Sequence, residues 1–467
     1  MTLEPSAITK ALTDVDQYCQ SLSEFVTASP SSYHAAAELA RRLEGQGFQE
    51  VDEKRTWGPE LARRGYVLRD GAVLAWMLPE VLDAAAVGET GTAAAADQAG
   101  AVAGHEFPPE AGFRIIGSHT DSPALKLKPT AALVRDGVQL LNMEVYGGPL
   151  LNSFLDRELG LAGRLVTLDG TVHLVRTGPV ARVAQVAPHL DRSVNDSLHL
   201  DKQANLLPLW TLVEDGATPQ PDDPERYLCE LAGVALEDLA FHDVVTYPTE
   251  PPARFGRHQE MLAASRLDNL SSVHASLVAL EAIAASGEQI REPIIMVAND
   301  HEEVGSLTRS GAGGPLLATV LRRLARVLGQ EGDAYAAMLA RSICVSADAG
   351  HAAHPNYGGL HDPAVRPHLN GGPLLKINAQ QRYATDAVGA AVWKRACKVA
   401  GVPSQDFVSN NAVPCGTTIG PITAGQLGVT TVDVGQPLLS MHSQRELCGV
   451  QDGAWMAQAM RAFWLGA

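Results

Sequence analysis

The 467-residue sequence is poor in several features that mark common classes of protein. Its six cysteines are scattered without a CxxC pair, which argues against a disulfide framework or a thiolate zinc site and predicts free thiols in a reducing compartment. No stretch approaches the ~20 consecutive apolar residues that a membrane-spanning helix needs. The N-terminus has no basic segment followed by an apolar one, so we expect no signal peptide and a cytoplasmic protein.

Positive charge is scarce as well. The chain has 36 Lys and Arg residues against 53 Asp and Glu residues, and the resulting net charge of −17 is spread along the sequence. A field of this sign repels the phosphates of nucleic acids and anionic membrane surfaces, so we expect neither as a partner. The length and a hydrophobic fraction of 46% are sufficient to bury a core without disulfides.

The chain changes character along its length. Apolar residues at three-to-four spacing predict that residues 1–80 are mainly helical, whereas the Ala/Gly/Thr tract 83–104 has no periodicity and is expected to be a surface loop without function. Residues 122–255 hold short β-rich runs broken by Gly and Asp turns. From residue 257 onward, helical segments alternate with buried strands such as PIIMVAND and VTTVDVG, a pattern typical of α/β domains.

This alternation predicts an α/β fold with a mixed, largely parallel sheet flanked by helices and a β-rich domain inserted into it. Residues 1–121 and 257–467 would fold together as one α/β domain. Residues 122–256 would form the inserted domain.

Acidic and histidine side chains gather in five loops that follow strands or open a helix. The loops are GSHTDSP, SRLDNL, NDHEEVGS, SADAGHAAHPNY and LLSMHSQRE. In open parallel sheets the carboxyl ends of the strands form the rim where ligands bind, so residues far apart in the sequence can converge there. The candidate side chains are His119, Asp121, Asp268, Glu302, Glu303, Asp348, His351, His354 and His442.

The residue types favour a pair of divalent ions. Two histidines and three carboxylates without cysteine form a nitrogen and oxygen ligand set that suits Zn²⁺, Co²⁺ or Mn²⁺. Five protein ligands are too many for one catalytic zinc, but they fit two ions that share a bridging carboxylate. Of the adjacent Glu302 and Glu303, one can bind metal while the other accepts a proton. Asp121, two residues after His119, can accept the second N–H of the imidazole.

Each loop taken alone also has a structural explanation. Asp268 is a competent helix N-cap, Glu302 and Glu303 fit a solvated pair, and His442 fits a surface histidine. His354, which precedes a proline, is interpreted as structural. The occurrence of five such loops, each after a plausible strand, is what favours a metal site over these alternatives.

The motifs HTDSP, RLDN, EEVGS, SAD..HA.HPNY, KIN..QRYATD, TIGPI and MHS.RE stand in this order along the chain. In sequence and order they resemble the motifs of the aspartyl aminopeptidases, a family of dinuclear zinc exopeptidases. The resemblance covers essentially the whole chain apart from residues 83–104. It implies a catalytic domain of the zinc-exopeptidase type, an inserted barrel-like dimerisation domain, and a tetrahedral dodecamer built from dimers.

The resemblance also implies roles for the residues around the metals. One ion would be held by His119, Asp268 and Asp348, and the other by Asp268, Glu303 and His442, so that Asp268 bridges them. Glu302 would act as the general base, and Asp121 would orient His119.

Substrate contacts follow from the same resemblance. Lys376 is the best-placed cation for an acidic side chain, and His351 and Tyr383 would lie beside the substrate. His189 corresponds to a histidine that reaches the active site of a neighbouring subunit. The chain departs from the family at His301, which stands where members can carry Asn and offers one more proton or metal contact.

We therefore predict a metalloaminopeptidase that removes N-terminal Asp or Glu from peptides. Two divalent ions per subunit, Zn²⁺ first with Co²⁺ or Mn²⁺ as alternatives, would bind the hydroxide that attacks the scissile carbonyl while Glu302 takes its proton. Two other functions fit the residues. One is a dinuclear amidase or deacylase, and the other is a binding or assembly protein without catalysis, against which the intact Glu302 and full ligand set count.

Overall fold

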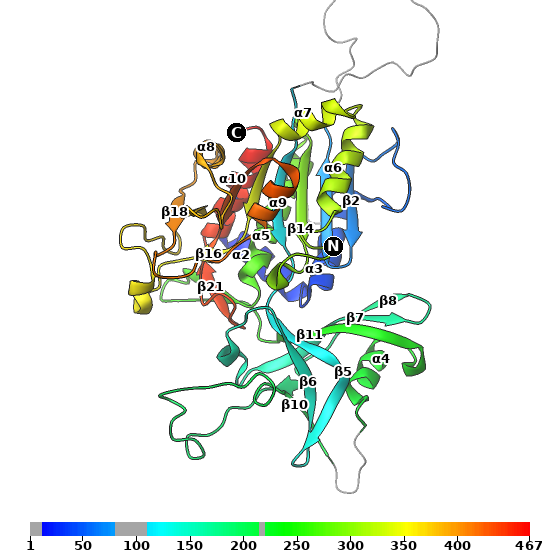
Figure 1. Cartoon of the computed structure of the whole chain (residues 1–467), viewed down its shortest axis with the longest axis vertical. Helices are drawn as coiled ribbons and strands as arrows, with labels where there is room; N and C mark the ends of the chain where they lie inside the picture. Colours follow the sequence, from blue (N-terminus) through cyan, green and yellow to red (C-terminus); the bar gives the residue numbers. More distant parts are fainter. Residues whose placement is uncertain (1–11, 80–109, 214–219) are drawn as a thin grey trace, which may run out of the picture.

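The computed structural model describes residues 12–79, 110–213 and 220–467, which form an α/β lobe and a β-rich lobe below it in Figure 1. The tract 83–104 lies outside the described residues. The α/β lobe is built on a nine-stranded mixed sheet. In spatial order its strands are β1 (Gln49–Glu50), β2 (Arg64–Arg69), β3 (Ala72–Met77), β14 (Ile294–Asn299), β4 (Arg114–His119), β15 (Ile343–Ala347), β19 (Thr430–Gly435), β17 (Leu374–Ile377) and β18 (Gln405–Val408).

The centre of this sheet is parallel, as the sequence predicts. Strands β14, β4, β15 and β19 pair in parallel, and antiparallel pairs with β3 and β17 lie on either side of them. Because the four central strands run the same way, their carboxyl ends meet at one edge of the sheet. The α/β architecture of the prediction is confirmed.

Helices cover both faces of the sheet, so its strands are buried on two sides. In β3, Val73 and Ala75 contribute to one core while Leu74 and Trp76 contribute to the other, which is the period of two expected of a strand. One face carries α2 (Val15–Ala28), α3 (Ser32–Glu44), α5 (Leu267–Ser286), α8 (Ala387–Ala400) and α10 (Asp452–Trp464). The other carries α6 (Leu316–Val327), α7 (Asp333–Arg341) and α9 (Ile419–Leu427).

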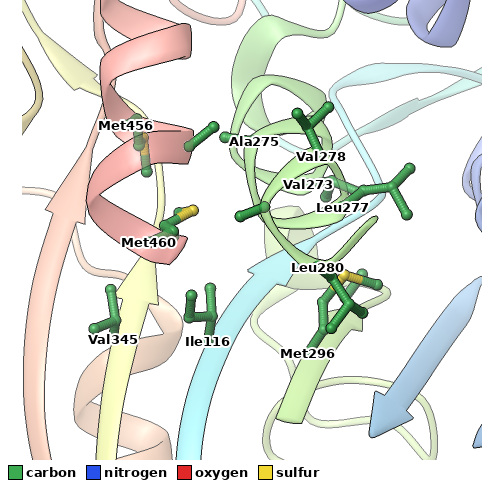
Figure 2. Close-up of a cluster of buried hydrophobic side chains, with 14 of the residues drawn as sticks. Ile116, Val273, Ala275, Leu277, Val278, Leu280, Met296, Val345, Met456 and Met460 are labelled. Carbon is green, nitrogen blue, oxygen red and sulfur yellow. The ribbon is translucent and has the colours of Figure 1, made fainter. Parts of the chain in front are cut away.

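The centre of the first core lies between α5, α10 and the sheet (Figure 2). Leu280 of α5 lies next to Met296 of β14, and Met460 of α10 lies close to Ile116 of β4. Helix α5 is buried along nearly its whole length, which explains its continuous apolar sequence. Its first turn is thereby held rigidly against the edge where the parallel strands end.

The prediction that residues 1–80 are mainly helical is wrong for the second part of that segment. Residues 64–77 form an antiparallel hairpin of β2 and β3, which turns at Asp70 and Gly71. Asp70 has a positive φ of 55°, a conformation that is common in tight hairpin turns. Strand β3 is a short continuous apolar run that is buried on both faces of the sheet, and such a run next to a turn favours a strand over a helix.

The β-rich lobe is a closed barrel of six antiparallel strands. They are β11 (Leu239–Pro248), β5 (Ala124–Arg135), β6 (Val138–Tyr146), β10 (Leu209–Leu212), β9 (Ala181–Arg182) and β7 (Glu158–Thr167), and the ring closes because β11 also pairs with β7. Strand β8 (Val172–Arg176) pairs with β7 outside the ring, and α4 (Asp223–Ala232) adds Leu228 and Cys229 to the barrel core. The barrel-like insertion is confirmed as an architecture, whereas boundaries at residues 121 and 256 stay a prediction.

A third sheet of five strands, which the sequence did not lead us to expect, lies in the α/β lobe. Its order is β12 (Ala253–Phe255), β13 (Met261–Ala264), β21 (Glu446–Gly449), β20 (Pro437–Leu439) and β16 (Gly350–His351). The loop between β20 and β21 carries His442. The small sheet therefore sets the position of a residue that no strand of the large sheet carries.

The cysteines and helices agree with the remaining structural expectations. All six cysteines lie in the described ranges and are free thiols. Among the residues that the structure describes, no helix is both long and apolar enough to cross a bilayer.

Candidate active site

The predicted metal ligands come from five places that the fold brings together. His119 is the last residue of β4, Asp348 directly follows β15, and Glu302 and Glu303 lie in the 3-10 helix η4 (Glu302–Val304) after β14. Asp268 lies in the first turn of α5. His442, in the loop between β20 and β21, is the fifth predicted ligand, whereas Glu302 is the predicted base.

Asp268 lies at the centre of two groups of potential ligands. Its Oδ1 is 3.3 Å from His119 Nε2, and its Oδ2 is 3.4 Å from His442 Nε2. Asp348 Oδ1 is 3.4 Å from the same nitrogen of His119, and Glu303 Oε1 is 3.5 Å from that of His442. We call His119 and Asp348 the His119 half and Glu303 and His442 the His442 half, with Asp268 shared. Within each three-residue set the ligand atoms lie within 4.8 Å of one another.

The donor set fits divalent cations. Asp268 Oδ1 and Glu303 Oε1 are buried without a hydrogen-bond partner, and nitrogen and carboxylate oxygens are the ligands that zinc prefers. Burial opposes a charge on His442, but Asp268 and Glu303 outweigh it and raise the pKa of His442 to about 10. Burial opposes a charge on His119 too, and Asp121, Asp268 and Asp348 raise its pKa. A bound cation would replace these protons, because metal binding requires neutral imidazoles.

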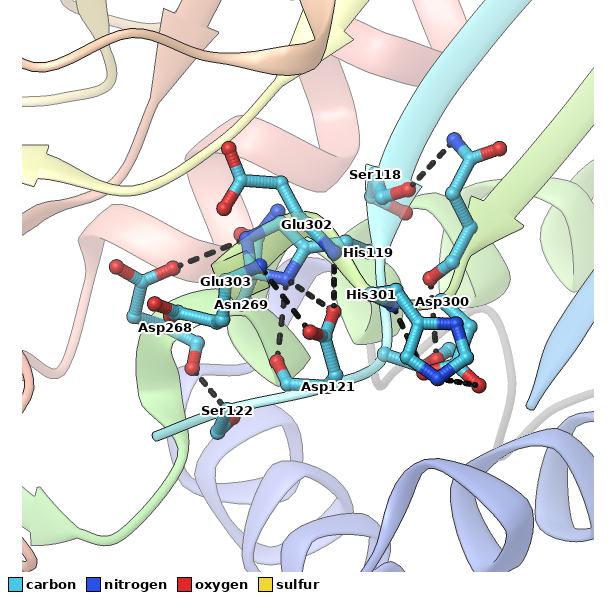
Figure 3. A network of polar contacts seen from close by, with 12 residues as sticks. Ser118, His119, Asp121, Ser122, Asp268, Asn269, Asp300, His301, Glu302 and Glu303 are labelled. Atoms are coloured by element: carbon cyan, nitrogen blue, oxygen red, sulfur yellow. Dashed lines mark hydrogen bonds and ion pairs between the residues drawn. The ribbon is translucent and has the colours of Figure 1, made fainter. Parts of the chain in front are cut away.

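Asp121 connects His119 with the glutamate pair (Figure 3). Its Oδ1 accepts a hydrogen bond from the backbone N–H of Glu302 at 3.0 Å and lies 3.3 Å from His119 Nδ1. Its Oδ2 accepts from the backbone N–H of Glu303 at 3.1 Å and from the Tyr146 hydroxyl at 2.8 Å. Burial raises the pKa of Asp121, but these contacts, His119 first, outweigh it and leave the pKa below its usual value. The carboxylate therefore stays charged.

Both histidines turn their Nε2 atoms toward Asp268 because their Nδ1 atoms face carbonyl oxygens. His119 Nδ1 is 3.1 Å from the backbone oxygen of Asp121, and His442 Nδ1 is 2.9 Å from that of Gly148. A carbonyl oxygen accepts only, so each Nδ1 is the protonated nitrogen and each Nε2 keeps its lone pair for a cation. Gly148 belongs to the barrel lobe, in the loop that follows β6.

The Glu446 carboxyl group accepts hydrogen bonds from the backbones of two predicted ligands. Its Oε2 accepts the backbone N–H of Asp268 at 2.9 Å, and its Oε1 accepts that of His442 at 2.7 Å. The side chain is buried, and burial raises its pKa to about 8. One carboxyl group thus fixes the backbone of the shared ligand and of a ligand in the His442 half.

Glu302 is the acidic side chain best suited to proton transfer. Burial, followed by the charges of Asp348, Asp268 and Asp121, raises its pKa to about 7 despite the opposing effect of His119. A carboxyl group that titrates near neutrality can both accept and release a proton at that pH. Glu302 also forms a ligand set with His119 and Glu303, so it lies within reach of the cluster.

Lys376 lies directly behind Asp348. It is buried, its Nζ donates to the backbone oxygens of Asp348 and Ala349 at 3.1 and 2.9 Å, and it lies 3.6 Å from Asp348 Oδ2. The Tyr383 ring lies under this ammonium group, 4.8 Å from Nζ. The ammonium group therefore has two carbonyl acceptors and one carboxylate, that of Asp348, around it.

A cleft of about 410 Å³ is lined by Tyr383, whose ring also contacts this ammonium group. It is lined by His351 at its rim and by Tyr383, Phe407, Leu438 and Cys415 among others. His351 and Tyr383 thus line one cleft, and their predicted contact with the substrate stays a prediction.

Three other histidines lie apart from the cluster. His189 is exposed on the segment between β9 and β10, and the described ligand sets do not include it. His301 Nδ1 contacts the Thr308 hydroxyl at 3.0 Å, and its Nε2 lies 3.7 Å from Asp300. His301 therefore braces the loop after β14 instead of adding a metal contact. His354 caps the 3-10 helix η5 (Pro355–Leu360), a structural role.

Sequence reasoning missed three residues of the site: Tyr146, Gly148 and Glu446. Glu446 ends the MHS.RE motif, so a signal existed, since an acidic residue four positions after a metal-binding histidine is a candidate hydrogen-bond acceptor. Tyr146 and Gly148 carried no such signal, because their partners lie far away in the sequence.

Known proteins resemble this chain over nearly its whole length. The profile of the family described as "Aminopeptidase I zinc metalloprotease (M18)" matches residues 96–464. The "Probable M18 family aminopeptidase 2" of Streptomyces coelicolor is 46% identical over 444 residues, covering 95% of this chain and 96% of that protein. A protein of the same name from Pseudomonas paraeruginosa is 39% identical over 452 residues, covering 95% and 97% of the two chains.

Solved structures share the fold. One described as "Cryo-EM structure of the Ape4 and Nbr1 complex" superposes with a TM-score of 0.86 at 30% identity, covering all of this chain and 88% of the other. The mApe1 dodecamer of S. cerevisiae superposes with a TM-score of 0.78 at 26% identity, covering 96% of each chain. Together with the cluster of histidines and carboxylates, these similarities establish that the chain belongs to the M18 family of aminopeptidase I zinc metalloproteases.

Proposed function

We propose that this chain is a dinuclear aminopeptidase that removes acidic residues, Asp or Glu, from the N-termini of peptides. The observation that carries the dinuclear part is the position of Asp268, whose two carboxylate oxygens face His119 on one side and His442 on the other. One carboxylate shared between two sets of ligands is the arrangement expected of paired metal ions. Zinc is the metal of the family, and Co²⁺ or Mn²⁺ suits the same donors.

His119, Asp268 and Asp348 would hold one ion, and Asp268, Glu303 and His442 the other. When bound, such ions polarise a carbonyl group and lower the pKa of water. Glu302 would accept the proton of the attacking water and then deliver it to the leaving amine, as its pKa near neutrality allows. Asp121 would hold His119 and the Glu302 backbone in place through the contacts described above.

Recognition of an acidic side chain would depend on Lys376. Its ammonium group is buried next to the cluster, 3.6 Å from Asp348 Oδ2, and it would attract the carboxylate of an acidic substrate side chain. His351, at the rim of the same cleft, would contact the substrate, with Tyr383 supporting the ammonium group from below. His189 would act only in an assembly, where it reaches the site of a neighbouring subunit.

A second specificity is favoured by the lining of the cleft. Phe407, Leu438 and Tyr383 present apolar surface, which suits a neutral N-terminal side chain. The two specificities differ in how strongly Lys376 matters. If the enzyme prefers acidic substrates, Lys376→Met should lower kcat/KM far more for aspartyl-anilide than for leucyl-anilide. If it prefers neutral substrates, the substitution should lower kcat/KM equally for both, and the wild type should prefer leucyl-anilide.

The catalytic proposal is tested with Glu302→Gln. The substitution keeps the size of the side chain but removes its basicity, so we expect kcat to fall by about 10³-fold or more while zinc content stays at two ions per subunit. Metal content is measured by elemental analysis and turnover with aspartyl-anilide. Near wild-type activity would contradict the role of Glu302, and hydrolysis of N-acetyl-aspartyl-anilide would favour a deacylase.

The assembly and the place of action are also proposed. We infer that residues 122–256 form a dimerisation domain and that dimers build a tetrahedral dodecamer, as supported by the likeness to the mApe1 dodecamer. Six free thiols support a reducing, cytoplasmic location. Analytical ultracentrifugation would report the mass of a dodecamer, whereas a monomer or dimer at micromolar concentration would contradict it.

A further inference from the structure

We propose that Tyr146 is a positioning residue through which the barrel lobe orients the metal centre. It would act by holding the Asp121 carboxylate, which in turn holds His119 and the backbone of Glu302 and Glu303. The inference rests on the proposed dinuclear site and adds to it a residue of the other lobe.

The contacts of Asp121 show how much depends on its orientation. Its two oxygens meet four groups: the Tyr146 hydroxyl, two backbone N–H groups and the His119 ring. Tyr146 makes the shortest of these contacts, at 2.8 Å, and it is the one side chain among them that the barrel contributes. A rotation of the carboxylate would therefore move a metal ligand and the proposed base together.

The end of β6 is shaped to reach the site. Tyr146 is the last residue of this strand, and Gly147 follows with a positive φ of 73°. A Cβ atom on Gly147 would lie 3.2 Å from the Cβ of Glu303, so glycine allows the loop to approach the glutamate pair. The next carbonyl, that of Gly148, accepts the Nδ1–H of His442. Residues 147 and 148 thus contact the two ligands of the His442 half, and Tyr146 reaches the His119 half through Asp121.

Tyr146 is also a dependable donor. Burial, followed by the charge of Asp121, raises its pKa above the usual value for tyrosine, so the hydroxyl keeps its proton throughout the working range of pH.

The barrel lobe that carries Tyr146 is anchored to the α/β lobe by a separate contact. Arg164 of β7 binds Asp70 of the α/β lobe at 2.8 Å and Asp243 of the barrel at 3.0 Å. The position of Tyr146 therefore does not depend on its own hydrogen bond.

This arrangement predicts a specific change on removal of one hydroxyl group. Tyr146→Phe keeps the ring and its packing but leaves Asp121 with one donor fewer. Losses of 10- to 100-fold in metal affinity or activity are typical when a partner of a metal ligand is removed. We expect kcat for aspartyl-anilide and zinc affinity each to fall by about 10- to 100-fold, with KM changing less than about threefold.

The experiment compares full-length Tyr146→Phe with the wild type and with Tyr227→Phe. Tyr227 lies in α4 of the same lobe, where its ring packs on Trp210, so it controls for loss of a barrel tyrosine hydroxyl. Zinc affinity is measured by competition with a chelating dye, and thermal unfolding of the zinc-free proteins is followed in parallel. Unchanged zinc affinity and kcat in Tyr146→Phe, or equal losses in Tyr227→Phe, would overturn the proposal.

A double-mutant cycle tests the route through Asp121. If Tyr146 acts by holding this carboxylate, Tyr146→Phe lowers kcat little further in an Asp121→Asn background, because the two changes remove the same contact. Full additivity would mean that Tyr146 acts in another way and would overturn the proposal. The wild type provides the separate test of the site itself: if it binds no zinc, the proposed function fails, and if it binds two ions, only the role of Tyr146 is at issue.

Discussion

The two halves of the candidate metal centre are built in different ways. In the His119 half, both ligands lie at the carboxyl ends of parallel strands of the large mixed sheet, and the side chains of His119 and Asp348 are 1% and 9% exposed. In the His442 half, the His442 side chain is 31% exposed and lies on a loop of the small third sheet. Its Nδ1 is held by Gly148 of the barrel lobe.

The difference has a physical consequence. The ends of β4 and β15 are fixed by strand pairing within one sheet, so the His119 half needs only that sheet to fold correctly. The His442 half needs the third sheet, the barrel and the contact between the lobes to be in place at the same time. A change in lobe docking should therefore disturb the second half before the first.

Removing the shared ligand should erase the difference between the halves and have the largest effect. Asp268→Asn replaces a carboxylate oxygen with an amide nitrogen, which carries no negative charge and does not ligate zinc well. We expect both zinc ions to bind at least about 100-fold more weakly and activity to fall by about 10³-fold or more. Elemental analysis after dialysis checks this result. Retention of two tightly bound ions would mean that Asp268 does not bridge.

Single ligand removals should separate the halves. His119→Ala leaves a buried cavity among carboxylates, so the free energy of unfolding of the zinc-free protein should fall by about 2 kcal/mol. His442→Ala changes a partly exposed loop residue, so it should lower the free energy of unfolding of the zinc-free protein by less than about 0.5 kcal/mol. Each variant is expected to keep one zinc ion. Urea unfolding of the two variants measures the contrast, and equal losses of stability would contradict it.

The prediction with the smallest expected effect on the metal centre concerns the stability of the barrel alone, and it depends on pH. Glu225 of α4 is buried, its Oε2 has no hydrogen-bond partner, and burial raises its pKa to about 7. The folded state therefore keeps the proton longer than the unfolded chain, whose glutamates titrate near 4.5. Stability is lost as the pH rises from about 4.5 through 7, because ionisation is unfavourable only in the folded state.

Glu225→Gln should remove this loss. At pH 8 we expect the variant to be about 1 to 3 kcal/mol more stable than the wild type, at roughly 1.4 kcal/mol per pKa unit, and at pH 5 the difference should be much smaller. Urea unfolding at both pH values is the measurement. The control is Glu230→Gln, an exposed position of the same helix that should change little at either pH. A gain of the same size at pH 5 and pH 8 would show that the charge of Glu225 is not the cause.

Much of the fold followed from local patterns. The helix α5, the strands β4, β14, β15 and β19 and the β-rich lobe are each marked by apolar runs or turn residues that a single segment carries by itself. The hairpin of β2 and β3 was missed, although its Asp-Gly turn is a local signal, because helical spacing earlier in the segment was extended too far. The third sheet was missed for a different reason: its strands have two to four residues, too few to show a period.

The ligand types were determined by the sequence, because histidines and acidic residues after strands indicate both where ligands gather and which metals they suit. The geometry was decided by the tertiary structure. Only the tertiary structure shows that Asp268 faces both histidines. It also shows that Lys376 donates to two carbonyl oxygens and that Tyr146 of the barrel donates to Asp121. These contacts join residues distant along the chain, so no local pattern encodes them. The net charge of −17 likewise follows from the composition alone, whereas the position of the Lys376 ammonium group beside Asp348 depends on the fold.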